Sequence, residues 1–146
     1  MAKGKVSIIV LNWNGLQDTI ECLESINKIT YSNYEVLVVD NASTDGSAET
    51  IAQRFPNVTL IENKENLGYA EGNNTGIRYA LKHNSDFLLV LNNDTIVDPG
   101  ILDNFIKAST LYPDDGIFGA KIYYYAQPQK LWFAGGKWDE KRRNFV

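Results

Sequence analysis

The stretch FLLVLNNDTIVDPG, residues 87–100, decides the fold. Five consecutive apolar residues run directly into two amides and a carboxylate, Asn92, Asn93 and Asp94. A short, continuous apolar run is typical of a strand buried on both faces, as in a parallel sheet. The stretch therefore predicts a core strand over 87–94 that carries polar side chains to the carboxyl end of the sheet.

Other apolar runs share this character. They are VSIIVL at 6–11, YEVLVVD at Tyr34–Asp40 and, more weakly, NVTLIEN at 57–63. Helical patterns separate them at 16–26, Ser47–Arg54, 69–82 and 99–111, and we expect a last strand at 116–125. This alternation predicts an α/β fold, doubly wound, with a mainly parallel sheet flanked by helices.

The C-terminal stretch YYYAQPQKLWFAGGKWDEKRRNFV reads as a hairpin or loop followed by a strand that stops at Phe145 and Val146. No linker or repeat divides the chain, so we expect one domain over residues 1–146. Because a domain rarely ends on an apolar pair, we expect an N-terminal piece of a longer protein, truncated at its C-terminus.

Composition excludes several classes of protein. The 146 residues include 14 basic and 18 acidic ones, a net charge of -4, which disfavours a nucleic-acid partner. Cys22 is the single cysteine and lies on an apolar helical stripe, so we expect a buried, inert thiol and no disulfide. No apolar run reaches the roughly 20 residues of a transmembrane segment. A cytoplasmic location is the default expectation.

Polar residues follow each predicted strand before residue 95. They are Asn12; Asp40, Asn41 and Asp45; Asn66 and Gly68; and Asn92, Asn93 and Asp94. Ligands of open α/β sheets bind at the carboxyl ends of the strands. Each such residue taken alone is also a turn former or helix cap. Four polar ends together favour a binding site.

The oxygen-rich composition of these ends suits Mg²⁺ or Mn²⁺ with a phosphate-bearing substrate. A single His83 and a single Cys22 provide no soft ligand set for zinc. No P-loop or G-x-G-x-x-G follows the first strand, which disfavours a mononucleotide kinase or a Rossmann dehydrogenase.

Three glycines recur every fourth residue in the helix over 69–82 and just before it: Gly68, Gly72 and Gly76. Each interior glycine costs about 1 kcal/mol relative to alanine, so the row needs a reason. Close packing of the helix on the sheet and close approach to a ligand are both consistent with this spacing.

Four ordered blocks now stand out: VSIIVLNWNG, VLVVDNASTDGS, NLGYAEGNNTGIRYA and LLVLNNDTIVDPG. In order and spacing they resemble the nucleotide-sugar-binding half of a glycosyltransferase family 2 enzyme with a GT-A, Rossmann-like fold. The NWNG and LNND variants are most similar to the rhamnosyltransferase-like branch. The resemblance extends from residue 5 to about residue 137.

The resemblance implies a role for each matching residue. Asn12 would line the nucleotide pocket, Asp40 would accept a hydrogen bond from the base or ribose, and Asn41 and Asp45 belong to the same loop, which Asp45 would support. Residues implied near the base and diphosphate are Asn66, Gly68 and Asn73. Asn92, Asn93 and Asp94 match the D-x-D motif, with Asp94 as the metal ligand and Asn92 near the ribose or sugar hydroxyls. Because the first acid is an amide here, we expect weaker binding of Mg²⁺ or Mn²⁺.

The implied activity is inverting, metal-assisted transfer of a sugar from a UDP- or dTDP-sugar to an acceptor hydroxyl, in bacterial polysaccharide or cell-surface glycan synthesis. The acceptor would be a glycan or a lipid-linked acceptor, and the longer protein would work at the inner face of the membrane. The resemblance places the catalytic base beyond Val146. Asp139 and Glu140 stand among basic residues and are interpreted as a solvated charge cluster.

Alternatives stay open at this point. A sugar-stacking platform could be formed by Tyr123, Tyr124, Tyr125, Trp132, Phe133 and Trp138, or these residues could be core or subunit contacts, including those of a homodimer. The chain could also be a non-catalytic nucleotide-sugar-binding module or inactive fragment. A nucleotidyltransferase is disfavoured because NWNGLQD lacks a glycine-rich, basic loop.

Overall fold

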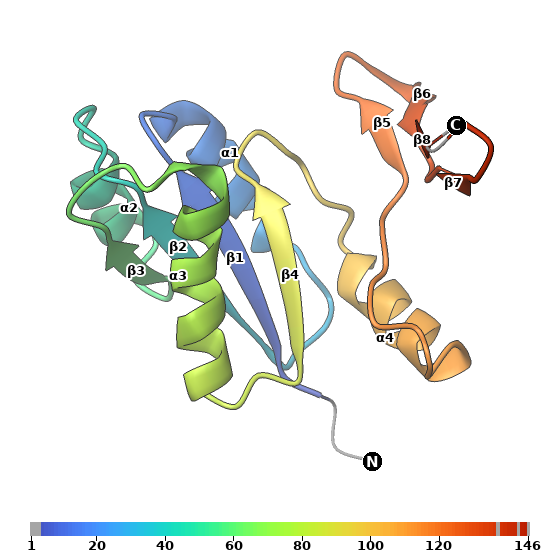
Figure 1. The fold of residues 1–146 in the computed structure, drawn as a ribbon. Coiled ribbons are helices and arrows are strands. Elements are labelled where there is room, and N and C mark those ends of the chain that lie inside the picture. Colours follow the sequence, from blue (N-terminus) through green and yellow to red (C-terminus); the bar gives the residue numbers. More distant parts are fainter. Residues whose placement is uncertain (1–3, 137, 143, 146) are drawn as a thin grey trace. The chain divides into compact units, whose positions relative to one another are not determined.

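The computed structural model describes residues 4–136, 138–142 and 144–145. In chain order the elements are β1 Val6–Asn12, α1 Leu16–Ile26, β2 Tyr34–Asp40, α2 Ser47–Arg54, β3 Thr59–Glu62, α3 Gly68–Lys82, β4 Phe87–Asn92, α4 Ile101–Leu111, β5 Ile122–Tyr124, β6 Gln127–Phe133, β7 Trp138–Asp139 and β8 Asn144–Phe145 (Figure 1). They form two compact units, Met1–Asp103 and Asn104–Val146.

The first unit is built on a parallel sheet with the strand order β3-β2-β1-β4. β1 and β2 pair along their whole length, so that Asn12 stands opposite Asp40 at the carboxyl end. The order reverses after β3, and right-handed connections then place α3 on the face opposite α1 and α2. This confirms the predicted doubly wound α/β fold, and it makes the β1–β4 boundary the point where a ligand is expected.

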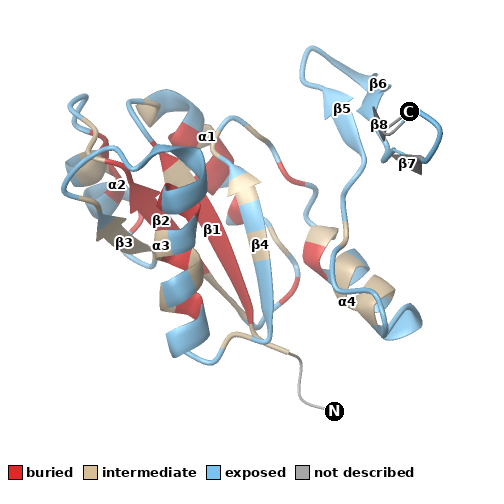
Figure 2. Ribbon diagram, viewed as in Figure 1, coloured by how far each residue is buried: buried red, intermediate tan, exposed pale blue. Residues whose placement is uncertain are grey.

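The core is built around β1 and β2, which Figure 2 shows as buried strands. Ile9, Leu37 and Val39 pack with Ala80 of α3 on one face. Their chain neighbours Ile8, Val10 and Val38 point to the other face and are also fully buried. Burial on both sides explains why these strands read as continuous apolar runs instead of alternating ones.

The prediction that residues 87–94 form a strand buried on both faces is wrong. β4 ends at Asn92, and Leu88 and Val90 are 38% and 42% exposed. Within the described residues β4 pairs with β1 alone, so it is an edge strand of this sheet. Apolar composition reports that a strand could be buried, but it does not report which strands have two neighbours.

The expected sheet strand over 116–125 is also wrong. Residues 116–121 form no strand, and β5 pairs antiparallel with β6 in a separate two-stranded sheet with irregular register. Closing a short hairpin costs less chain entropy than a long-range pairing, which favours the local partner. The hairpin predicted for the C-terminal region is present as β5 and β6.

The glycine row has two explanations. A Cβ on Gly72 would lie 2.6 Å from Leu11 Cδ1, and one on Gly76 would lie 2.6 Å from Ile9 Cγ2. These two glycines allow α3 to pack closely on the sheet. Gly68 has open space around it but a φ of +73°, so its reason is backbone conformation at the start of the helix.

Cys22 is buried as predicted, and burial raises the pKa of its thiol to about 11. Such a thiol stays protonated at neutral pH, which fits an inert packing role. Among the described residues, no helix has the length and apolar character needed to cross a bilayer.

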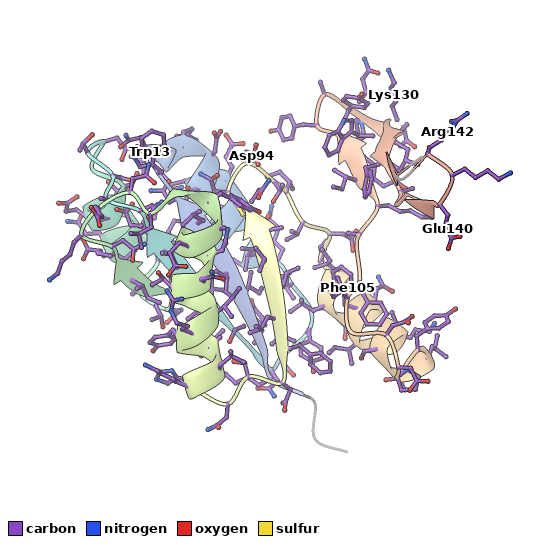
Figure 3. All side chains as sticks on the ribbon, in the orientation of Figure 1. Trp13, Asp94, Phe105, Lys130, Glu140 and Arg142 are labelled. Carbon is purple, nitrogen blue, oxygen red and sulfur yellow. The ribbon has the colours of Figure 1, made fainter. Side chains whose placement is uncertain are left out.

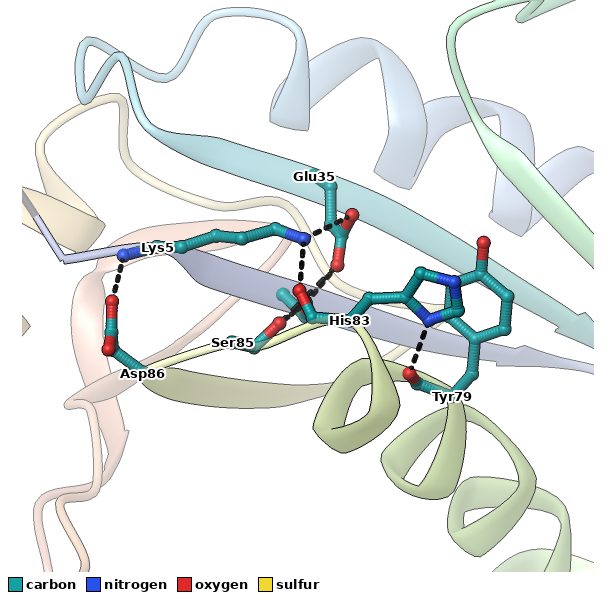
Figure 4. Close-up of polar contacts among 7 residues, drawn as sticks. Lys5, Glu35, Tyr79, His83, Ser85 and Asp86 are labelled. Carbon is teal, nitrogen blue, oxygen red and sulfur yellow. Dashed lines mark hydrogen bonds and ion pairs between the residues drawn. The ribbon is translucent and has the colours of Figure 1, made fainter.

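A polar cluster fastens the amino ends of the strands (Figure 4). Ser7 Oγ donates to Glu35 Oε1 at 2.5 Å and lies 2.5 Å from Ser85 Oγ, so it joins β1, β2 and the segment before β4. Lys5 Nζ pairs with Glu35 at 2.9 Å. Burial alone would raise the pKa of Glu35, but the hydrogen bonds from Ser7 and Lys5 outweigh it and lower that pKa.

We predict that Gly76→Ala lowers the free energy of unfolding by about 1–2 kcal/mol, because its Cβ would strike core side chains of Ile9 and Val39. Gly119→Ala is the matched control, since nothing lies within 4 Å of its added Cβ. Urea denaturation measures both variants. Equal stability of the two variants would contradict the close packing of α3.

A second prediction concerns pH. Because folding lowers the pKa of Glu35, its stabilising effect is complete above the unfolded-state pKa and is lost as pH falls through the folded-state value. Denaturation midpoints between pH 6 and pH 3 should therefore fall less steeply in Glu35→Gln than in the unchanged protein. Parallel curves for the two proteins would show that the cluster does not hold a charged Glu35.

Candidate functional site

The segments at the carboxyl ends of β1, β2, β3 and β4 form a polar edge of the sheet that we call the rim. It consists of residues 12–15, 40–46, 63–68 and 92–95. Asn12 is at its centre. Its Nδ2 donates to Asp40 Oδ1 at 2.7 Å and to Ser43 Oγ at 3.1 Å. Its Oδ1 accepts from Gly15 N at 3.2 Å and from Thr19 Oγ1 at 2.9 Å. The amide therefore uses both donors and both lone pairs within the protein.

Two carboxylates hold the loop that follows β2. Asp40 is 2% exposed and accepts from Asn12 and, at 2.9 Å, from the backbone N–H of Ser43. Asp45 accepts from the backbone N–H groups of Leu16 and Ser47, so one side chain binds the first residue of α1 and the first residue of α2. The Ser47 hydroxyl also donates to it, and this bond is the largest of the contributions that lower the pKa of Asp45.

The loops after β1 and β2 are held in uncommon backbone conformations. Asn14 and Ala42 have φ of 51° and 61°, and Gly46 has φ of 79°. For an alanine this region is costly, and such residues persist where surrounding contacts fix them. Asn14 supplies two of these contacts, since its N–H donates to Ser43 Oγ at 2.9 Å and its Oδ1 accepts from Thr44 N at 2.7 Å.

Asn41 fixes the loop between β3 and α3. Its Nδ2 donates to Asn66 Oδ1 at 2.7 Å and to the Gly68 carbonyl at 3.2 Å. Its Oδ1 accepts from Asn63 Nδ2 at 3.0 Å and from Leu67 N at 3.1 Å. Like Asn12, this buried amide has all of its hydrogen-bonding capacity in use.

The residues after β4 diverge toward two helices. Asn93 Nδ2 donates to Thr19 Oγ1 of α1 at 3.0 Å, and Thr19 in turn donates to Asn12. Asn92 lies on the other side, where Tyr69 of α3 donates its hydroxyl to Asn92 Oδ1 at 3.0 Å. Asp94 follows and is exposed. A relay of side chains from Asn93 to Asp40 thus connects the ends of β4, β1 and β2.

Burial separates the residues predicted for the site into two sets. The side chains of Asn12, Asp40, Asn41 and Asn73 lie beneath the surface, whereas Asp45, Asn66, Gly68, Asn92 and Asp94 are exposed and Asn93 is half-buried. The structure brings all of them except Asn73, which lies on α3, to the rim. The buried residues shape it, and the exposed ones are available to a ligand.

Sequence reasoning missed several residues of this arrangement. Trp13 is 57% exposed at the end of β1, and Figure 3 shows it at the same end of the sheet as Asp94. Tyr69, Thr19 and Ser43 join the network through their hydroxyls. Trp13 could have been predicted, because the sequence places it directly after a strand. The hydroxyl partners could not, because their contacts depend on how the helices and loops pack.

The side-chain oxygen of Asn73 has no hydrogen-bond partner among the described residues. Asn73 Nδ2 donates to the Tyr69 carbonyl at 2.9 Å, which holds the first turn of α3. Its Oδ1 is the buried side-chain oxygen that finds no partner among the described residues. Such an atom is costly to leave unpaired, and a buried water is its simplest partner.

The chemistry of the rim fits a metal ion that arrives with its substrate. Among the described residues, no group of three histidine, cysteine or acidic side chains is close enough to hold an ion. Asp94 is an exposed carboxylate next to Asn92 and Asn93. Mg²⁺ is commonly held by one or two carboxylates, with phosphate oxygens and waters completing its shell. The donor set therefore fits an ion that is shared with a phosphate.

The second unit carries exposed aromatic side chains. Tyr123, Tyr124, Tyr125, Trp132 and Phe133 are between 44% and 80% exposed on the β5–β6 hairpin and its turn. Lys130 lies over the ring of Tyr124, 5.0 Å from its centroid. Glu140 is exposed, while the side chains of Trp138 and Asp139 lie outside the described residues.

The fold and rim define a class: a doubly wound α/β domain whose polar rim lies where the strand order reverses, which is where nucleotide-binding folds hold their ligands. The family follows from comparison with known proteins. Residues 7–145 match the family described as "Glycosyl transferase family 2". This chain belongs to glycosyltransferase family 2, and its fold is GT-A.

Individual relatives agree. The chain is 32% identical over 108 residues to the N-acetylglucosaminyl-diphospho-decaprenol L-rhamnosyltransferase of Mycobacterium tuberculosis, a match that covers 68% of this chain and 35% of the relative. The mannosyltransferase PcManGT from Pyrobaculum calidifontis, solved with GDP-Man and Mn²⁺, is 27% identical with a TM-score of 0.70, over 84% of this chain and 36% of that one.

S. aureus TarS (residues 1–349), solved with UDP-GlcNAc, is 23% identical with a TM-score of 0.67, over 75% of this chain and 32% of that one, and this likeness concerns the fold. The chain thus spans about a third of the length of these relatives.

We predict that Asn12→Asp destabilises the fold by about 2–4 kcal/mol at neutral pH, because two buried carboxylates would then face each other. Repulsion raises a folded-state pKa of the pair, so stability should recover as pH falls and one carboxyl takes a proton. Thermal unfolding at pH 7.5 and 5 measures this.

Asn14→Asp is the matched control for that substitution. Asn14 uses its side-chain oxygen as an acceptor from Thr44, and a carboxylate keeps that role. We expect a change of less than about 1 kcal/mol. Similar losses in the two variants would show that Asn12 is not the fixed point of the rim.

Proposed function

We propose that this chain is the donor-binding part of a glycosyltransferase that transfers a sugar from a nucleoside diphosphate sugar to an acceptor hydroxyl. The observation that carries the proposal is the relay from Asn93 through Thr19 and Asn12 to Asp40, which holds the ends of β4, β1 and β2 in one rim. It is supported by the family match over residues 7–145.

The rim suggests how a donor would lie. The nucleoside would occupy the β1 and β2 loops, where exposed Trp13 offers a ring for stacking on the base. Residues with roles at this end are Asp40, Asn41, Asp45 and Asn66, the buried ones acting by holding the loops. The diphosphate and sugar would extend toward Asn92, Asn93 and Asp94 of β4, near the start of α3 at Gly68, whose first turn Asn73 holds.

Asp94 would hold Mg²⁺ or Mn²⁺ together with the diphosphate. A divalent ion there supplies positive charge against the leaving nucleoside diphosphate. The Mn²⁺ and GDP-Man in the structure of PcManGT support a divalent ion that binds together with the donor. An amide at position 92 gives this rim less negative charge than two acids would, so affinity for the free ion should be low.

The wider reaction is proposed by family likeness. The donor would be a UDP- or dTDP-sugar, the transfer inverting, and the acceptor a glycan or a lipid-linked sugar in bacterial surface-polysaccharide synthesis. The name of the Mycobacterium tuberculosis relative, which specifies a decaprenol-linked acceptor, supports a lipid-linked one. The base that deprotonates the acceptor would come from a segment beyond Val146.

We predict that UDP or dTDP binds in calorimetry and that Mn²⁺ strengthens binding by roughly tenfold, the effect of a charge-assisted contact of about 1.4 kcal/mol. Mn²⁺ titrated alone should bind weakly, because the described residues offer no group of three acidic, histidine or cysteine side chains. Asp94→Ala should remove the gain from Mn²⁺ and leave metal-free binding unchanged.

Asp114→Ala is the control, since Asp114 is an exposed carboxylate in the turn after α4. It should bind like the unchanged protein. Failure of both nucleotides to bind with either metal would overturn the proposed function. Binding without any sugar transfer by the longer protein would instead identify a non-catalytic nucleotide-sugar-binding module.

A further inference from the structure

The β5–β6 hairpin carries a cluster of apolar side chains that are open to solvent. Its register sets Ile122 opposite Phe133 and Tyr123 opposite Leu131, so that apolar side chains are cross-strand neighbours. The ring of Trp132 lies beside them, with its centroid 6.4 Å from that of Phe133. All five side chains are between 39% and 61% exposed. The name hairpin surface is used for Ile122, Tyr123, Tyr124, Tyr125, Lys130, Leu131, Trp132 and Phe133.

A hairpin of this kind needs a partner surface. Every residue of β5 and β6 is exposed, so the described residues of the second unit bury neither strand. Two strands without a covering layer are marginally stable in water. A contiguous exposed apolar surface marks a contact with a protein or with a membrane. The chemistry of the hairpin surface therefore has to identify its partner.

Charge is divided unevenly along the chain. Residues 104–146 contain seven basic and four acidic side chains, a net charge of +3, whereas residues 1–103 contain seven basic and fourteen acidic ones, a net charge of -7. Residues 116–138 contain three lysines and no acidic residue. A basic surface on an otherwise acidic chain attracts an anionic partner and turns the protein toward it. The partner of the hairpin surface is therefore expected to be anionic.

Lysine is part of the apolar surface itself. Lys130 Nζ lies 5.0 Å from the ring centroid of Tyr124, and Lys130 is followed directly by Leu131 and Trp132. Lysine is depleted at the centre of protein–protein interfaces. At a membrane, a lysine can lay its carbon stem along apolar groups and keep its ammonium among the headgroups. Tyrosine and tryptophan are enriched at the same depth. This composition favours lipid over a protein partner.

We propose that the hairpin surface binds the face of a bilayer that contains anionic phospholipid. Leu131, Trp132 and Phe133 would enter the boundary between headgroups and acyl chains. Lys121 and Lys130 would contact lipid phosphates. The hairpin forms a two-stranded sheet with open edges, whose backbone groups need water or headgroups as partners. It therefore lies at the boundary and does not enter the hydrocarbon core.

This surface adds a second binding function to the donor site. It would hold the enzyme at the membrane that contains a lipid-linked acceptor, and for this purpose it rests on the proposed function. Lipid binding itself requires neither nucleotide nor metal, so vesicles test it separately. Failure to bind UDP would overturn the proposed function alone, and failure to bind vesicles would overturn this inference alone.

Co-sedimentation with vesicles measures the binding. The longer protein should bind vesicles of phosphatidylcholine mixed with phosphatidylglycerol roughly thirtyfold more tightly than vesicles of phosphatidylcholine alone, the effect of two lysines near an anionic surface. Added salt should reduce this difference, because it screens the lipid charge. Equal binding to the two kinds of vesicle, or binding to neither, would overturn the inference.

Substitution of single lysines tests whether the hairpin makes the contact. Lys121→Gln and Lys130→Gln should each weaken binding to the anionic vesicles roughly fivefold and leave binding to the neutral ones unchanged. Lys28→Gln is the matched control, because Lys28 is an exposed lysine of the first unit, in the turn after α1. It should bind like the unchanged protein. An equal loss in Lys28→Gln would show that binding follows net charge, contrary to the inference.

The apolar contact has a matched pair of leucines. Leu131→Ala should weaken binding to both kinds of vesicle roughly fivefold, because the carbon atoms removed are partly buried in lipid. Leu81 lies on α3 and is also exposed, so Leu81→Ala removes the same atoms from a surface outside the hairpin. Its binding should not change. Equal losses in the two variants would overturn the assignment to the hairpin surface.

Fluorescence distinguishes a bilayer from other partners of the hairpin surface. Phospholipids brominated in their acyl chains should quench the longer protein, and this quenching should fall in Trp132→Phe but persist in Trp13→Phe. If Trp132 were not quenched, the rest of the longer chain would cover the hairpin surface. A dimer that is lost in Leu131→Ala and does not bind vesicles would instead identify a second copy as the partner. Either result would overturn the inference.

Discussion

The hydrogen bond from Asn12 Nδ2 to Asp40 Oδ1, 2.7 Å long and buried, is the interaction on which the rim depends. A buried carboxylate needs donors, and Asp40 obtains them from Asn12 and from the backbone of Ser43. The oxygen of the same amide accepts a hydrogen bond from the Thr19 hydroxyl, which in turn accepts one from Asn93 Nδ2. One side chain thus makes the ends of three strands mutually dependent, so that each holds its position because the others do.

The register of the sheet makes this interaction available. β1 and β2 pair so that Asn12 stands opposite Asp40, and the Asn41 N–H continues the ladder by donating to the Asn12 carbonyl at 2.8 Å. At the amino ends, Ser7 stands opposite Glu35 and donates to it. A slip of one residue would break both polar pairs, whereas the apolar side chains of β1 and β2 would still meet apolar neighbours because both faces are buried. The two polar pairs therefore specify the alignment.

Much of this architecture could be predicted from the sequence. Apolar runs separated by helical patterns indicated the parallel sheet, and polar strand ends indicated the rim with Asp40 and Asp94 at one end. The exposure of β4 could not be predicted, because the number of neighbours of a strand is a property of topology and not of its own residues. The strand expected over 116–125 was misassigned for a similar reason: its residues suit a strand, but β5 pairs with the nearby β6 and not with the parallel sheet.

Prediction was weaker for the roles of individual residues. Asn12 and Asn41 are as polar as Asn92, yet the first two spend every hydrogen bond inside the protein while the third faces solvent. Their sequence context is alike, since each ends or follows a strand. The difference arises from which helix turn or loop lies above each amide, and this is decided by tertiary packing. The partners Tyr69 and Thr19 could therefore be identified only from the structure.

The left-handed backbone of Asn14, Ala42 and Gly46 bears on the cost of recognition. Loops that must be ordered on binding subtract from affinity the freedom that they give up. In this chain the loops after β1 and β2 lose that conformational entropy during folding. The contacts of Asn14 with Ser43 and Thr44 keep them ordered. A nucleotide would therefore bind to loops that are already ordered, so we expect binding to a preformed surface and not an induced fit.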